Sequence, residues 1–215
     1  METNAAATLP VTAVAKNSME QPQVTPAETQ ELLKLAQSLL DNRVEGDFVE
    51  LGCYKGDTSI LLQKLLKDSG ALGARQLWLY DSFAGLPEKT PEDAYSAGDA
   101  FRGGELFVTK REVVAKFKKA NLPLPVIKKA FFGDLSPAED LPPAIAFAFL
   151  DGDLYSSIKT SFNLVLPKLS PQGIIVVHDY NNPELPGASK AVDEFLRAHP
   201  DFKLAHRHTL AILAR

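Results

Sequence analysis

Carboxylates and an imidazole follow two apolar segments of this sequence, in a combination that could hold a metal ion or move a proton. Asp151 and Asp153 come directly after the run IAFAFL, and His178 and Asp179 come after the run GIIVV. Like charges at such close spacing repel, so either a cation lies between them or one carboxyl takes up a proton. Oxygen ligands with few soft donors favour Mg²⁺ or Mn²⁺ over zinc. The structural alternative is that Asp153 caps the following helix and Asp179 caps a turn.

A second group of residues has the chemistry of a cofactor site. Glu50 is followed by a G-x-x-x-G turn, Gly52 to Gly56, between an apolar segment and a helical one. Glycine allows a tight turn and lets a ligand approach the backbone, although such turns also serve packing. The turn lacks the G-x-G-x-x-G pattern of dinucleotide sites, which argues against a nucleotide-dependent oxidoreductase. Asp81, at the end of the next apolar segment, could bind a ribose diol or cap a turn.

Alternating strand and helix patterns predict that these residues share one edge of a sheet. Parallel strands are expected at 47–52, 76–80, 125–131, 145–150 and 173–177. Helices are expected at 26–42, 58–66, 105–120, 155–166 and 187–198. This alternation predicts a doubly wound α/β fold, and the segments 202–206 and 209–214 predict an antiparallel pair at its edge. Ligands bind outside the carboxyl ends of parallel strands, so the acidic residues should face one cleft.

The first helix has a clear start, which separates a leader from a single domain. Thr25 can cap the helix, Pro26 suits its first position, and Glu28 stands where a capping box needs an acidic residue. Residues 1–24 are rich in Ala, Thr, Asn, Gln and Pro and read as a flexible leader. We therefore expect one domain over residues 25–215.

Composition narrows the class of protein. The 215 residues carry 23 basic and 27 acidic side chains, a formal charge of −4, which argues against a nucleic-acid partner. A lysine-rich stretch, 110–119, has the apolar spacing of an amphipathic helix. No apolar run approaches the length of a membrane span. The single cysteine, Cys53, excludes an intrachain disulfide and fits a reducing, cytoplasmic location.

Four longer motifs resemble the macrocin O-methyltransferase family. They are FVELGCYKGDTS (48–59), LYDSFAGLP (79–87), FLDGDLYSS (149–157) and PKLSPQGIIVVHDY (167–180). The resemblance covers roughly residues 26–182. It implies a class I methyltransferase fold, a Rossmann-like seven-stranded sheet with an antiparallel last strand. It also implies transfer of a methyl group from S-adenosylmethionine (SAM) to a hydroxyl of a small natural product, on a sugar or an aromatic ring.

The resemblance, carried over residue by residue, also implies a cofactor site. Glu50, Gly52 and Gly56 would hold the methionine part of SAM, and Asp81 the ribose. Ser82 and Phe83 would flank the sugar, and Phe131 or Phe132 would lie against the adenine. Asp134 would lie near the adenine amino group. The full set of expected cofactor residues is Glu50, Gly52, Tyr54, Gly56, Thr58, Ser59, Asp81, Ser82, Phe83, Phe131, Asp134 and Asp151.

The resemblance further implies that Asp151 and Asp179 bind Mg²⁺ and that Asp153 is the general base. The family usually has D-D-Y where this sequence has His178-Asp179-Tyr180. Imidazole is a poorer ligand for Mg²⁺ than carboxylate, so this departure leaves open whether the metal is Mg²⁺ or Mn²⁺ and whether the reaction depends on a metal. His178 could ligate the metal or act as a base.

Several functional alternatives stay open at this stage. A catechol-type O-methyltransferase, acting on vicinal phenol hydroxyls, uses a similar metal at the strand ends. A protein that binds SAM without catalysis is the alternative outside the enzymes. Family members are commonly dimers, which allows a homodimer here. The long segment 87–104 is either a lid with glycine hinges at Gly98, Gly103 and Gly104 or an ordinary surface excursion.

Overall fold

The computed structural model describes residues 23–94 and 100–215 of the chain. The helices of the described part are α1 (Pro26–Asp41), α2 (Asp57–Asp68), α3 (Lys110–Lys119), α4 (Tyr155–Val165) and α5 (Pro186–Ala198). Its strands are β1 (Asp47–Leu51), β2 (Leu77–Asp81), β3 (Val126–Lys129), β4 (Ile145–Leu150), β5 (Leu169–Val177), β6 (Lys203–Arg207) and β7 (Leu210–Ala214). The described part also contains three short 3-10 helices, η1 (Pro91–Asp93), η2 (Phe132–Asp134) and η3 (Leu166–Lys168).

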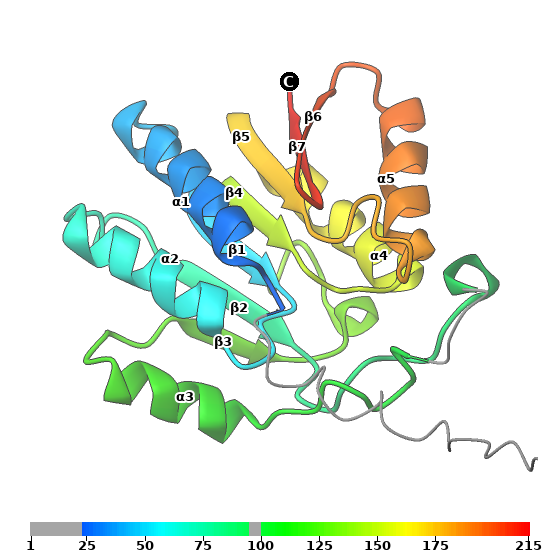
Figure 1. Cartoon of the computed structure of the whole chain (residues 1–215). Coiled ribbons are helices and arrows are strands. Elements are labelled where there is room, and N and C mark those ends of the chain that lie inside the picture. Colours follow the sequence, from blue (N-terminus) through cyan, green and yellow to red (C-terminus); the bar gives the residue numbers. More distant parts are fainter. Residues whose placement is uncertain (1–22, 95–99) are drawn as a thin grey trace, which may run out of the picture.

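The strands form one seven-stranded sheet in the order β3-β2-β1-β4-β5-β7-β6. The first five are parallel, whereas β7 runs antiparallel to both β5 and β6. Helices α1, α2 and α3 cover one face of the sheet, and α4 and α5 cover the other (Figure 1). Strand order reverses between β1 and β4, which is where ligands bind in sheets of this kind. The doubly wound fold and the closing antiparallel pair expected from the sequence are confirmed.

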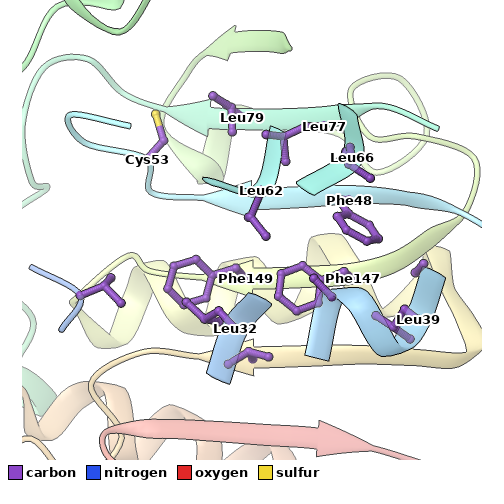
Figure 2. Close-up of a cluster of buried hydrophobic side chains, with 14 of the residues drawn as sticks. Leu32, Leu39, Phe48, Cys53, Leu62, Leu66, Leu77, Leu79, Phe147 and Phe149 are labelled. Atoms are coloured by element: carbon purple, nitrogen blue, oxygen red, sulfur yellow. The ribbon is translucent and has the colours of Figure 1, made fainter. Parts of the chain in front are cut away.

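Burial of apolar side chains on both faces of the sheet explains why the central strands are apolar throughout. All six residues of β4 are buried, with Phe147 and Phe149 on the face covered by α1 and α2 (Figure 2). Leu32 of α1 and Leu62 of α2 pack into the same cluster. This continuous core fixes the level at which the strands end, and hence the edge that carries the acidic residues.

Two element boundaries differ from the sequence prediction. Helix α3 begins at Lys110 and not at 105, because Thr109 caps it in a capping box with Glu112. Strand β5 begins at Leu169, four residues before the expected 173, and carries a register irregularity opposite β4. The remaining helices and strands differ from the prediction by only one or two residues at each end.

The segment 87–104 was expected to be either a lid or a surface excursion. Its 3-10 helix η1 contacts α4 and α5 through Asp93. Asp93 of η1 is buried, and its Oδ1 accepts a 2.7 Å hydrogen bond from the backbone N–H of Tyr155 at the start of α4. Gly187 of α5 packs so closely against Asp93 that a Cβ there would lie 1.9 Å from Oδ1. Gly98 lies outside the described residues.

The start of α1 has the predicted capping box of Thr25 and Glu28. Of the expected leader, residues 1–22 lie outside the described part, whereas Val24 is buried in the core cluster beneath α1. Over the described residues, no helix is both long enough and apolar enough to cross a membrane.

Candidate active site

The backbone beyond β1, β4 and β5 continues the sheet's hydrogen bonding for one more residue. Gly52 donates its N–H to the carbonyl of Tyr80 at 2.8 Å, and Asp151 donates to Leu51 at 2.8 Å. His178 donates its backbone N–H to Leu150 at 3.0 Å. These bonds bring the residues that follow neighbouring strands to one level, as the sequence predicted for Gly52, Asp151 and His178.

Four non-glycine residues at these strand ends adopt the left-handed backbone region. They are Tyr54 after β1 (φ 42°), Phe83 after β2 (φ 47°), Asp153 after β4 (φ 58°) and Asp179 after β5 (φ 61°). This conformation costs an L-residue about 1–2 kcal/mol, and such strain gathers at functional sites. The sharp turns direct the chain back over the sheet edge, which leaves a concave space above it.

That space is a cavity of about 290 Å³. Its walls come from the turns after β1, β2, β3 and β4, from the first turns of α4, and from the segment between β2 and α3. The lining residues are Gln23, Gly52, Tyr54, Asp81, Ser82, Gly85, Leu86, Pro87, Leu106, Ala130, Phe131, Phe132, Gly133, Asp151, Gly152, Asp153, Ser156, Ser157 and Thr160.

The expected cofactor residues divide into two groups around this cavity. Those that line it are Gly52, Tyr54, Asp81, Ser82, Phe131 and Asp151. Those that do not are Glu50, Gly56, Thr58, Ser59, Phe83 and Asp134. Asp134 is exposed, whereas Phe83 is buried behind the turn. Three further lining residues, Leu86, Pro87 and Ser156, lie within the motifs that resemble the family but had no assigned role, and no sequence pattern marked Gln23, Leu106 or Thr160.

Glu50 lies beneath the glycine turn. Its side chain is buried, and its Oε2 accepts a 2.5 Å hydrogen bond from the hydroxyl of Ser59. Burial raises the pKa of Glu50 well above its ordinary value, and the nearby carboxylates of Asp151 and Asp81 act in the same direction against the bond from Ser59. A cation above the turn would favour the charged form of this carboxyl.

Gly52 is required at its position by the approach of another strand end. Its φ is +95°, and a Cβ there would lie 1.9 Å from the carbonyl oxygen of Asp151. The first glycine of the motif therefore lets the turn after β1 touch the loop after β4. At this contact, the part of the cavity wall that follows β1 meets the part that follows β4.

Asp81 holds the turn after β1 and also faces the cavity. Its Oδ2 accepts hydrogen bonds from the backbone N–H groups of Cys53 (3.1 Å) and Tyr54 (3.0 Å), and its Oδ1 accepts one from Phe83 (2.8 Å). Burial raises the pKa of Asp81, although these three bonds oppose the rise. The bond from Phe83 closes a local turn, which was the alternative to ribose binding expected for Asp81. Asp81 therefore both caps this turn and lines the cavity.

Asp153 is set apart from the other carboxylates. The N-cap of α4 is Leu154, so Asp153 is not the cap of this helix. Among the described residues, none donates a hydrogen bond to its side chain, which lines the cavity. Burial, together with the charges of Asp151 and Asp179, raises the pKa of Asp153 well above its ordinary value. A carboxylate with these properties is suited to accept a proton.

Asp151, His178 and Asp179 converge as the sequence predicted. Nδ1 of His178 lies 2.8 Å from Oδ1 of Asp151 and 3.1 Å from Oδ2 of Asp179. One ligand atom from each residue lies within 4.8 Å of the others, a spacing that could hold a metal ion. Asp179 also accepts a 2.7 Å bond from the Asn182 side chain, which closes the turn after β5.

Glu28 is the charged neighbour of this group that the sequence did not reveal. Its carboxylate is 2% exposed, and its Oε2 lies 3.7 Å from Nε2 of His178. Burial lowers the pKa of His178, but the carboxylates of Asp151, Asp179 and Glu28 outweigh it, so that the pKa lies well above its ordinary value. The capping-box motif identified Glu28 only as a local feature of α1.

Comparison with known proteins finds relatives both by sequence and by structure. The sequence profile of the family described as macrocin-O-methyltransferase (TylF) matches residues 17–203. A tetracenomycin-C rhamnosyl 4'-O-methyltransferase of Streptomyces olivaceus is 32% identical over 67% of this chain and 56% of its own length. Demethyldecarbamoylnovobiocin O-methyltransferase of Streptomyces niveus is 32% identical over 74% of this chain and 61% of its own. The matches thus span less than two thirds of these relatives.

The solved structure of the O-methyltransferase NovP is similar in three dimensions. It superposes with a TM-score of 0.75 at 28% identity, over 88% of this chain and 79% of that one. The structural similarity therefore extends over most of this chain.

Proposed function

The chain belongs to the macrocin-O-methyltransferase (TylF) family, and from this membership we propose that it transfers the methyl group of SAM to a hydroxyl of a small natural product. The two relatives described above are named for methylation of a rhamnosyl sugar and of a novobiocin precursor. We therefore propose a sugar or aromatic hydroxyl as the acceptor.

One observation carries the proposal: a single cavity contains both kinds of group that the reaction needs. Gly52 and Asp81 bound it on the side of β1 and β2, and Asp151 and Asp153 bound it on the side of β4. A cofactor on the first side and a hydroxyl on the second would share one enclosed space. Holding two reactants in fixed orientation is a large part of the rate enhancement in group transfer.

We assign the roles of the chain's own residues as follows. Asp81 accepts hydrogen bonds from the ribose, and the backbone around Gly52 lies along the methionine part of SAM. Phe131, which is 43% exposed at the cavity wall, offers its ring to the adenine. Asp153 takes the proton of the acceptor hydroxyl as the methyl group is transferred. The buried carboxylates, including Glu50 below the turn, favour the cationic SAM over its neutral-sulfur product, S-adenosylhomocysteine (SAH).

The donor set fits a divalent ion. Two carboxylates and one imidazole nitrogen converge, and Asp151 faces the cavity, so we propose that Asp151, His178 and Asp179 hold Mg²⁺ or Mn²⁺. Replacement of one oxygen ligand by a nitrogen shifts the preference toward Mn²⁺. Such an ion, when bound, acts as a Lewis acid toward a hydroxyl group.

The proposal is tested by incubating the purified chain with methyl-labelled SAM and three acceptor classes: glycosides with free sugar hydroxyls, single phenols and vicinal phenols. We expect label in a sugar or single-phenol product, loss of transfer in EDTA, and recovery on addition of Mn²⁺ or Mg²⁺. Transfer at full rate in EDTA would contradict the metal assignment.

The other outcomes separate the remaining alternatives. Label confined to vicinal phenols would identify a catechol-type enzyme. Binding of SAH without transfer to any acceptor would favour a SAM-binding protein that lacks catalysis. Size-exclusion chromatography with light scattering tests our further proposal of a homodimer, and fractionation of the source cells tests the proposed cytoplasmic location.

A further inference from the structure

We infer that Glu28 is a positioning residue, which holds the imidazole of His178 so that its Nδ1 atom faces Asp151 and Asp179. The inference concerns a residue of the first helix, outside the motifs that resemble the family, and it rests on the proposed function of the Asp151, His178 and Asp179 group. Its basis is the way in which the Glu28 carboxylate is fixed and the side of the ring on which it lies.

The Glu28 carboxylate uses both oxygens, unlike an ordinary capping-box glutamate. Oε2 accepts hydrogen bonds from the backbone N–H (2.9 Å) and the hydroxyl (2.7 Å) of Thr25. Oε1 accepts bonds from the backbone N–H (3.0 Å) and the hydroxyl (2.5 Å) of Thr209, which precedes β7. Four donors fix the position of this carboxylate and, with the neighbouring His178 ring, hold the pKa of Glu28 well below its ordinary range against the effect of burial.

The fixed carboxylate lies on the opposite side of the His178 ring from the two aspartates. Nε2 is 3.7 Å from Glu28, a distance within ion-pair range but too long for a hydrogen bond. A carboxylate that accepts but does not donate favours a proton on the ring nitrogen that faces it. The same rule places a proton on Nδ1 as well before an ion binds, because Nδ1 lies 2.8 and 3.1 Å from the carboxylates of Asp151 and Asp179. An ion held by Asp151, His178 and Asp179 would replace the Nδ1 proton, and Glu28 would retain the proton on Nε2.

Proteins orient many metal-ligating histidines with a carboxylate on the far side of the ring, and Glu28 lies on that side of His178 at the longer distance of an ion pair. Such a ring coordinates through one nitrogen and directs the other toward a carboxylate or carbonyl, which sets both tautomer and orientation. Tyr180, two residues after His178, donates its backbone N–H to the carbonyl of Thr209 at 2.8 Å. Glu28, Thr209 and the turn after β5 thus form one hydrogen-bonded unit, through which the docking of α1 fixes the His178 ring.

The test compares Glu28→Gln with Glu112→Gln. Glu112 makes the same capping box with Thr109 at the start of α3, but it is exposed and its partners are local. Mn²⁺ affinity is measured by electron paramagnetic resonance, and SAH affinity by calorimetry. We expect Glu28→Gln to weaken Mn²⁺ binding about tenfold or more, as other substitutions behind a metal ligand do, and Glu112→Gln to leave it unchanged. SAH affinity should be retained in both.

A second readout keeps the inference separate from the metal proposal. The ¹⁵N resonances of His178, assigned by their loss in His178→Asn, report on the ring nitrogens directly. If the wild-type protein binds no Mn²⁺, the metal proposal fails, and Glu28 is judged by whether Glu28→Gln shifts these resonances. If Glu28→Gln does not fold, Thr209→Val is used, since it removes one donor to Glu28 without touching His178. Unchanged Mn²⁺ affinity or, without metal, unchanged His178 resonances would overturn the inference.

Discussion

Substitution of Gly52 by alanine is expected to lower the free energy of unfolding by about 2–5 kcal/mol, the sum of left-handed strain and forced displacement of a packed neighbour. The new Cβ would lie 1.9 Å from the carbonyl oxygen of Asp151 and 2.6 Å from its carbonyl carbon. Both are backbone atoms at the end of β4, so neither can move aside by changing a rotamer. Urea unfolding followed by circular dichroism measures the loss.

Gly73→Ala is the matched control for this substitution. Gly73 also has a positive φ, +105°, but a Cβ there would meet nothing within 4 Å. Its substitution should cost about 1 kcal/mol, the conformational contribution alone. If Gly52→Ala is no more destabilising than Gly73→Ala, the close approach of the two strand ends is not what requires the glycine.

Asp153→Asn is expected to lower kcat about 10²- to 10⁴-fold, the range typical for loss of a general base. The amide keeps the shape of the side chain but does not accept a proton, so SAH should still bind. In the wild-type protein, only ionised Asp153 is active as a base. Activity should therefore rise with pH through the pKa of Asp153, which lies well above its ordinary value. This rise should be absent from the pH–rate profile of the variant.

The control for Asp153→Asn is Asp68→Asn, which alters an exposed carboxylate whose one ion-pair partner among residues 23–94 and 100–215 is Lys64, also on α2. It should retain wild-type kcat and the wild-type pH profile. The measurement is the steady-state rate with an acceptor that the wild-type protein methylates. A wild-type rate in Asp153→Asn would mean that another group accepts the proton of the hydroxyl.

The alternation of strands and helices, and the shared sheet edge at which the strands end, could be predicted from the sequence because both follow from local patterns. Continuous apolar runs predicted β4 and β5, and the acidic residues directly after them had to meet at the edge of a parallel sheet. Gly52 was expected to let a ligand approach the backbone closely. Its neighbour turned out to be the Asp151 carbonyl, which a motif alone does not identify.

The role of Glu28 could not be predicted because its partner lies far along the chain. Thr209 is 181 positions away, and the capping box around Thr25 already accounted for an acidic residue at this place. Apolar spacing alone places the start of α3 at 105, whereas the capping box of Thr109 and Glu112 starts the helix at Lys110. The contact between Glu28 and His178 depends on the pairing of β7 with β5, because Thr209, which binds Glu28, precedes β7. Neither the helical nor the strand period of apolar residues predicts such a contact.

Calorimetric titration of the purified chain with SAH tests the account most directly. We predict one binding site per chain, with the affinity lowered at least about tenfold by Asp81→Asn, because a hydrogen bond to a charged group contributes about 1.5–3 kcal/mol. Asp153→Asn should bind SAH like the wild-type protein. Absence of binding, or full affinity in a folded Asp81→Asn variant, would contradict the assignment of this cavity to SAM.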